Sequence, residues 1–219
     1  MTVPAEGDRA VTTVEELLEH PDIVRLRAAL ALRPGMRIDA EDALVRLAAI
    51  ALVLRPGIAG APELLMIKRA EAERDPWSGH VACPGGRMEP GDHDLEQTAV
   101  RETWEETGVD LARDGRVLGA LDDISPRTPV LPPIIVRPFV AVVKPEVDIV
   151  QSSEVAEAFW VPLEALRERA SWGTGLVTVR GHGEREVSVF RHGDYTVWGL
   201  TERVLRQFLE YLGDQTTSE

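Results

Sequence analysis

The stretch that decides the fold is residues 85–109, which read GGRMEPGDHDLEQTAVRETWEETGV. A helix is predicted over residues 94–107, because Leu95 and Ala99 recur on one side of it among polar residues. Gly108 directly follows, at the position where helices prefer glycine as a C-terminal cap. A glycine pair, an acidic loop and a polar helix therefore follow one another without a break.

Three glutamates of this helix, Glu102, Glu105 and Glu106, are spaced so that their carboxylates crowd one face. Like charges at this spacing destabilise an isolated helix by about 0.2–0.5 kcal/mol per pair. A divalent cation would offset the repulsion, and Mg²⁺ or Mn²⁺ takes oxygen ligands and bridges to substrate phosphates. The plainer alternative is a solvated acidic helix face.

The order of a glycine pair, an acidic loop and Arg-Glu-x-x-Glu-Glu-x-Gly resembles the Nudix box. This box is the signature of hydrolases that cleave nucleoside diphosphates linked to another moiety. The resemblance implies that Mg²⁺ or Mn²⁺ is bound by Glu102, Glu105 and Glu106, with a carbonyl from Gly86. It also implies that Glu102 is the catalytic base and that Arg101 holds a box carboxylate in place.

The box is one residue longer than usual between Gly86 and Arg101. The position at which the usual box carries a glutamate falls on Asp92 when it is counted from Gly86, and on His93 when it is counted back from Arg101. We expect Asp92 to take this acidic role. Glu154, which lies in SSEVAEAFWVPL, is a second candidate for an additional acid or base. An ordinary solvated loop is the alternative there.

The extra residue, and segments 65–70, 79–86 and 195–201, resemble the coenzyme A diphosphatase branch of the family. The match is partial, since Cys83 stands where the branch carries phenylalanine. Coenzyme A or its thioesters are the expected small-molecule substrates. Other nucleoside-diphosphate derivatives stay open as alternatives, namely ADP-ribose, nucleotide sugars and dinucleotides. A non-catalytic ligand sensor of the same fold is a more remote one.

Four residues before the glycine pair are candidates for substrate binding. Lys68, Arg69 and Arg74 carry positive charge that could reach phosphate groups, and Trp77 is placed to stack on a base. For Lys68 and Arg69, the alternative is that they protect an edge strand from pairing.

Composition limits the possible partners. The net charge of −13 disfavours nucleic acid and anionic membrane surfaces. The longest apolar run, residues 47–54, is far below the ~20 residues of a membrane helix. Cys83 is the only cysteine, and the acidic N-terminal stretch is unlike a signal peptide. We therefore expect a cytoplasmic protein without disulfides whose anionic substrate arrives with metal, and the family implies a possible homodimer.

The resemblance implies an α+β Nudix fold, an α/β/α sandwich with a mixed sheet, plus N-terminal helices and a C-terminal helix. Pro138 lies within a strand-like run and predicts an edge strand or a bulge. The extra helices could pack on the same core or on a second subunit. The expected domains are an N-terminal helical extension (1–45), a Nudix hydrolase domain (46–212) and a disordered tail (213–219). The expected strands are 47–54, 63–68, 116–122 and 134–143, and the expected outer helices are 14–20, 22–32 and 200–212.

Overall fold

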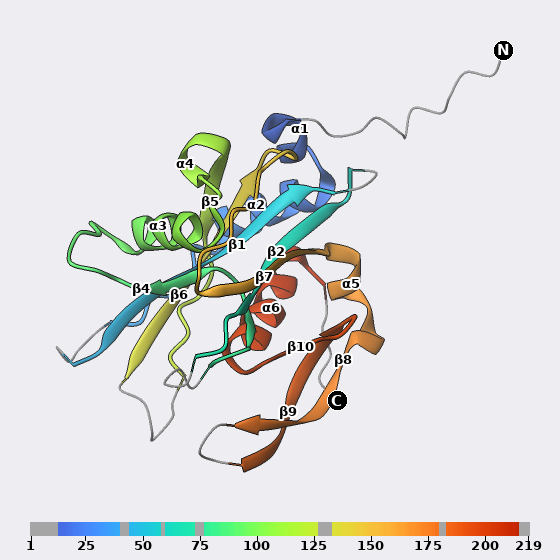
Figure 1. Cartoon of the computed structure of the whole chain (residues 1–219). Helices are drawn as coiled ribbons and strands as arrows, with labels where there is room; N and C mark the ends of the chain where they lie inside the picture. The colour runs from blue at the N-terminus through green and yellow to red at the C-terminus, as the bar shows by residue number, and fades with distance from the viewer. Residues whose placement is uncertain are drawn as a thin grey trace.

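The computed structural model describes residues 13–39, 44–57, 60–72, 77–126, 133–179 and 183–214. Its central sheet contains β1 (Arg46–Pro56), β2 (Pro62–Arg69), β3 (Val81–Ala82), β4 (Gly85–Arg87), β5 (Gly115–Ala120), β6 (Ile134–Val143) and β7 (Val155–Pro162). The main order is β3-β2-β1-β6-β5, with β4 also paired to β1 and β7 to β2 (Figure 1). The pairing of β1 with β2 is antiparallel and that with β6 is parallel. The sheet is therefore mixed, as expected.

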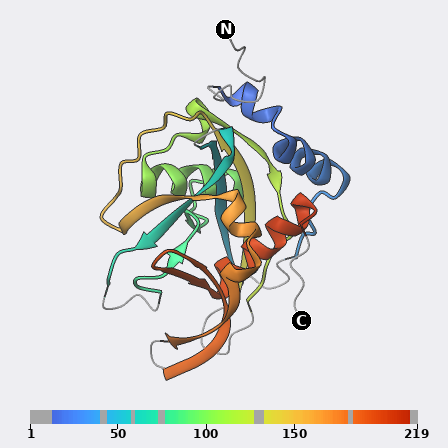
Figure 2. The same ribbon diagram turned by 90° about the vertical axis from the view of Figure 1, so that its right-hand side faces the viewer.

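Helices cover both faces of this sheet. Side chains alternate along β1, so Leu52 and Leu54 face a core that includes α6 (Gly199–Leu212), while Ala51 faces a second core beside α3 (Leu95–Thr107). Figure 2 shows the sheet between these two helices. The arrangement confirms an α+β fold with an α/β/α order of layers.

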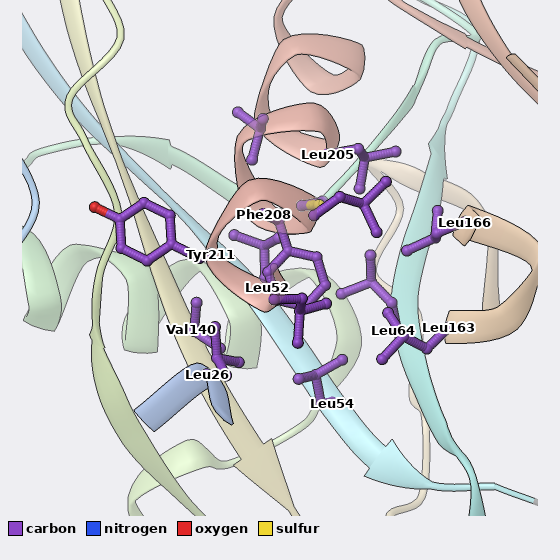
Figure 3. Packing of buried hydrophobic residues seen from close by; sticks show 14 of the residues in the cluster. Leu26, Leu52, Leu54, Leu64, Val140, Leu163, Leu166, Leu205, Phe208 and Tyr211 are labelled. Atoms are coloured by element: carbon purple, nitrogen blue, oxygen red, sulfur yellow. The ribbon is translucent and has the colours of Figure 1, made fainter. Parts of the chain in front are cut away.

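The N-terminal helices belong to the same core. α1 (Val14–Leu18) and α2 (Pro21–Leu32) contribute Leu17 and Leu26, both fully buried, to the cluster that also contains Phe208 of α6. Figure 3 shows Leu26, Leu52 and Phe208 in this cluster. The extension therefore packs on the core of its own chain, which settles the question that the sequence left open.

A second, three-stranded sheet lies beside α6. It consists of β8 (Trp172–Val179), β9 (Gly183–His192) and β10 (Tyr195–Trp198) in the order β10-β9-β8. The short helix α4 (Leu111–Asp114) leads from α3 into β5, and α5 (Leu163–Arg167) with a 3-10 turn at Arg169–Ser171 connects β7 of the main sheet to β8 of the second. Among the described residues, no helix is long and apolar enough to cross a membrane.

Two expectations differ from the structure at the ends and edges of elements. β6 lies between β1 and β5, so the edge position predicted from Pro138 is wrong. The proline lacks only the N–H: its carbonyl accepts a hydrogen bond of 2.9 Å from the N–H of Leu121, just beyond the last β5 pair, Ala120–Phe139. At the C-terminus, Gly213 caps α6 and Asp214 accepts a hydrogen bond of 2.8 Å from Nε of Arg167. These two residues of the expected tail are thus hydrogen-bonded to the end of α6, and residues 215–219 lie outside the described part.

Candidate active site

Local signals fix the helix that carries the box glutamates. Asp94 caps the start of α3, where its side chain accepts a hydrogen bond of 2.8 Å from the N–H of Gln97. Gly108 ends the helix with a φ of 71°, a left-handed conformation that favours glycine. Buried Leu95 and Ala99 hold the helix against the sheet. The helix is therefore locked at both ends and on one face.

The glycine pair lies directly beside the glutamates. β4 places Gly85 and Gly86 next to β1, and the N–H of Gly85 donates a hydrogen bond of 2.8 Å to Oε2 of Glu106. A Cβ atom at Gly86 would lie 2.3 Å from Oε1 of Glu102, closer than real contacts allow. Position 86 therefore has to be glycine for the Glu102 carboxylate to lie where it does.

Arg101 connects the acidic groups. Its guanidinium donates to both carboxylate oxygens of Asp92, with distances of 3.0 and 2.9 Å. The same group donates to Oε1 of Glu102 at 3.0 Å and to Oε2 of Glu105 at 2.9 Å. Arg101 is thus a hydrogen-bond partner of box carboxylates, which is the contact that the resemblance implies.

Asp92 is buried in this contact. It also accepts hydrogen bonds from the Thr98 hydroxyl and from the N–H of Glu89, each 2.9 Å long. The Arg101 guanidinium holds the pKa of Asp92 well below its ordinary value. Its hydrogen-bond partners all favour the ionised form, although burial opposes it, and its strongest contact is the one with Arg101. His93, the other candidate position, uses its backbone N–H to bond Gln97.

Burial and mutual repulsion perturb two of the glutamates. Burial raises the pKa of Glu106 to about 7, and the carboxylates of Glu102 and Glu154 add to the effect. The pKa of Glu102 is also raised, first by burial and further by Glu105 and Glu154. Glu154 thus contributes to the raised pKa of both Glu102 and Glu106, while Glu105 is more exposed than Glu102.

The donor set suits a hard cation. All the groups are carboxylate or carbonyl oxygens, the ligands that Mg²⁺ and Mn²⁺ prefer, and a cation would relieve their repulsion. Within the described ranges, no three His, Cys, Asp or Glu side chains are already gathered as a metal-ligand set. Glu102 and Glu105 instead bond to Arg101. The residues therefore fit a cation by chemistry and by the space at Gly86.

The candidate substrate-binding residues do not all lie together. Nη1 of Arg69 lies 3.9 Å from Oε1 of Glu106, so this arginine reaches the site. Lys68, the preceding residue, pairs with Glu157, with 3.2 Å between Nζ and Oε1, and the Tyr195 hydroxyl donates to Oε2 of Glu157 at 2.6 Å. Trp77 is 40% exposed in the loop before β3. Arg74 lies outside the described residues.

Some partners of the site were missed from the sequence. Thr98 supports Asp92 from one turn of α3, and Ser152 bonds to the backbone of Glu154. Tyr195 comes from the second sheet and fixes Glu157. Hydroxyl groups give no signal by residue type alone. The positions of Thr98, six residues after Asp92, and of Ser152, two residues before Glu154, could have indicated their contacts, whereas the Tyr195 contact depends on chain packing.

Comparison with known proteins agrees with the geometry. Residues 44–178 match the family model described as the NUDIX domain. Mitochondrial coenzyme A diphosphatase NUDT8 of Homo sapiens is 33% identical over 171 residues, covering 77% of this chain and 71% of that protein. The Mus musculus protein of the same name is 32% identical over 200 residues, covering 89% and 90%.

Solved structures share the fold. A MutT/nudix family protein from Enterococcus faecalis aligns with a TM-score of 0.55 at 18% identity, over 96% of this chain and 78% of the other. A NUDIX hydrolase from Alicyclobacillus acidocaldarius aligns with a TM-score of 0.51 at 20% identity, over 78% and 93%. Together with the family model and the relatives, the box geometry shows that this chain belongs to the Nudix hydrolase family.

Proposed function

We propose that this Nudix hydrolase is a Mg²⁺- or Mn²⁺-dependent diphosphatase that cleaves coenzyme A or its thioesters. The observation that carries the proposal is the position of Glu102 and Glu106 on α3 directly beside the Gly85–Gly86 pair, with Arg101 bonded to Glu102. The choice of substrate is supported by the two NUDT8 relatives, which are coenzyme A diphosphatases. The products would be 3',5'-ADP and the matching phosphopantetheine.

The candidate site residues would have different roles in the reaction. Glu102, Glu105 and Glu106, with the carbonyl of Gly86, would hold the cation, which supplies charge neutralisation for the diphosphate and a lower pKa for the attacking water. Glu102 would accept the proton of that water as the general base.

Two arginines complete the site. Arg101 would fix the orientation of Glu102 through the hydrogen bond of 3.0 Å between Nη1 and Oε1. Arg69, beside Glu106, would place positive charge next to the diphosphate oxygens. The remaining surface is acidic overall, so the cation and these arginines would provide the attraction for an anionic substrate.

A substrate panel tests the proposal. The purified protein is incubated with Mg²⁺ and, in parallel, coenzyme A, acetyl-coenzyme A, ADP-ribose, a nucleotide sugar and a dinucleoside tetraphosphate. Release of 3',5'-ADP from coenzyme A, abolished by EDTA, supports it. Hydrolysis of ADP-ribose without turnover of coenzyme A would contradict the choice of substrate. No turnover of any of them, with ligand binding retained, would indicate a sensor instead.

Assembly and location are part of the same proposal. We expect a cytoplasmic protein and a homodimer, the latter from the family resemblance. The named relatives include mitochondrial proteins and a peroxisomal coenzyme A diphosphatase, ndx-8 of Caenorhabditis elegans. Sedimentation velocity tests the dimer and fluorescence microscopy of the tagged protein tests the location.

A further inference from the structure

The chain before β7 crosses the C-terminal end of α3. The N–H of Val150 donates to the carbonyl of Thr107 at 2.8 Å, and the N–H of Ser152 donates to the carbonyl of Glu106 at 3.2 Å. A helix leaves its last carbonyl groups without partners of its own, so these contacts complete the end of α3. Segment 150–154 is thereby attached to the residue that carries a site carboxylate.

Ser152 also holds Glu154. The N–H of Glu154 donates to Oγ of Ser152 at 3.2 Å, while the carbonyl of Glu154 accepts a hydrogen bond of 2.8 Å from the N–H of Ala70. The Ser152 backbone is bonded to Glu106, so one residue links the backbones of Glu106 and Glu154. Ala70 in turn follows Arg69, whose guanidinium lies beside Glu106.

The pairing of β2 with β7 becomes irregular at this point. Lys68 pairs with Glu157 but Arg69 pairs with Val155, so β7 has one extra residue, Ala156. Such bulges redirect the chain and are frequent next to active sites. Here the extra residue lies two positions after Glu154, which is exposed.

We propose that Ser152 is a positioning residue of the diphosphatase site: it holds the backbone of Glu154 beside the end of α3, so that the Glu154 carboxylate could join that of Glu106 in holding a cation. This inference rests on the proposed function. The alternative is an ordinary serine turn that only stabilises the loop. The two differ in one respect: a positioning role requires the Glu154 carboxylate, whereas a turn does not.

The first test measures Mn²⁺ binding to the full chain by isothermal titration calorimetry. Loss of a group that supports a metal ligand typically weakens metal binding 10- to 100-fold, so we expect Ser152→Ala to bind Mn²⁺ roughly tenfold more weakly. Its kcat should fall while KM changes less. Ser152→Thr keeps the hydroxyl and should restore binding. Ser153→Ala, at the exposed neighbouring serine, is the matched control and should behave as wild type.

A double-mutant comparison separates positioning from loop stability. In a Glu154→Gln background, Ser152→Ala should weaken Mn²⁺ binding no further. An equal loss in both backgrounds, or wild-type binding by Ser152→Ala, would overturn the proposal even if the wild type is an active diphosphatase. A wild type that neither binds Mn²⁺ nor hydrolyses any diphosphate would instead refute the proposed function, and the role of Ser152 with it.

Discussion

Replacing Gly86 by alanine should displace the Glu102 carboxylate while leaving the fold intact. The new Cβ atom would lie 2.3 Å from Oε1, 2.5 Å from Cδ and 2.8 Å from Oε2 of Glu102. Ordinary contact begins at 3.4 Å, so the carboxylate has to move by about 1.1 Å. A misplacement of about 1 Å at a catalytic group can cost roughly 100-fold in rate. We therefore expect kcat to fall about 100-fold.

Stability should change little in this variant. The clash is with the end of a flexible side chain, and alanine within a strand is favoured over glycine by about 0.5–1 kcal/mol. The free energy of unfolding, from urea titration, should stay within about 1 kcal/mol of wild type. Gly91→Ala is the matched control, because no atom lies within 4 Å of its new Cβ.

The assay follows release of 3',5'-ADP from coenzyme A by chromatography at saturating Mg²⁺. Gly91→Ala should keep its kcat within about twofold of wild type, since its methyl group meets open space. Wild-type kcat in Gly86→Ala would show that the position of Glu102 is not needed for the reaction. An equal loss in Gly91→Ala would assign the effect to the loop rather than to the carboxylate.

Three further changes test other parts of the structure. Asp92→Asn leaves the Arg101 guanidinium without its buried partner and should lower the urea-derived free energy of unfolding by about 2 kcal/mol; an unchanged value would contradict this role. Leu26→Ala empties a fully buried position of α2 and should cost about 2–5 kcal/mol, whereas a loosely attached extension would give almost no change.

The third change concerns pH. The Arg113 guanidinium and the Lys144 ammonium lower the pKa of Asp114 to about 2. The ion pairs of Asp114 therefore contribute fully to the free energy of unfolding above about pH 4, and their contribution is lost as the pH falls towards 2. The urea midpoint of Lys144→Met should therefore approach that of wild type on acidification, and a constant difference would contradict it.

Local signals explain why the site helix could be predicted from the sequence. The caps Asp94 and Gly108 and the spacing of Glu102 and Glu106 all act within one helix, and the structure confirms α3 within one residue of the expected start. The glycine pair is likewise close in sequence to the helix it serves. Short-range patterns therefore gave both the helix and most of its candidate ligands.

Contacts between distant segments could not be predicted in the same way. Pro138 indicated an edge strand or a bulge, but β6 lies between β1 and β5, and the Pro138 carbonyl still accepts a hydrogen bond of 2.9 Å from the N–H of Leu121. Lys68 and Arg69 looked equivalent, yet successive side chains of a strand point to opposite faces, and only Arg69 reaches Glu106. These outcomes depend on where neighbouring strands end and which face is covered.

Metal-dependent turnover of coenzyme A in Glu102→Gln and Glu106→Gln tests the central claim most directly. Each variant keeps the side-chain size but removes a carboxylate charge, so we expect Mg²⁺-dependent release of 3',5'-ADP to fall at least about 100-fold. Glu96→Gln, at an exposed position in the first turn of the same helix, is the control and should retain wild-type activity. Full metal-dependent activity in Glu102→Gln or Glu106→Gln would contradict the assignment of this site.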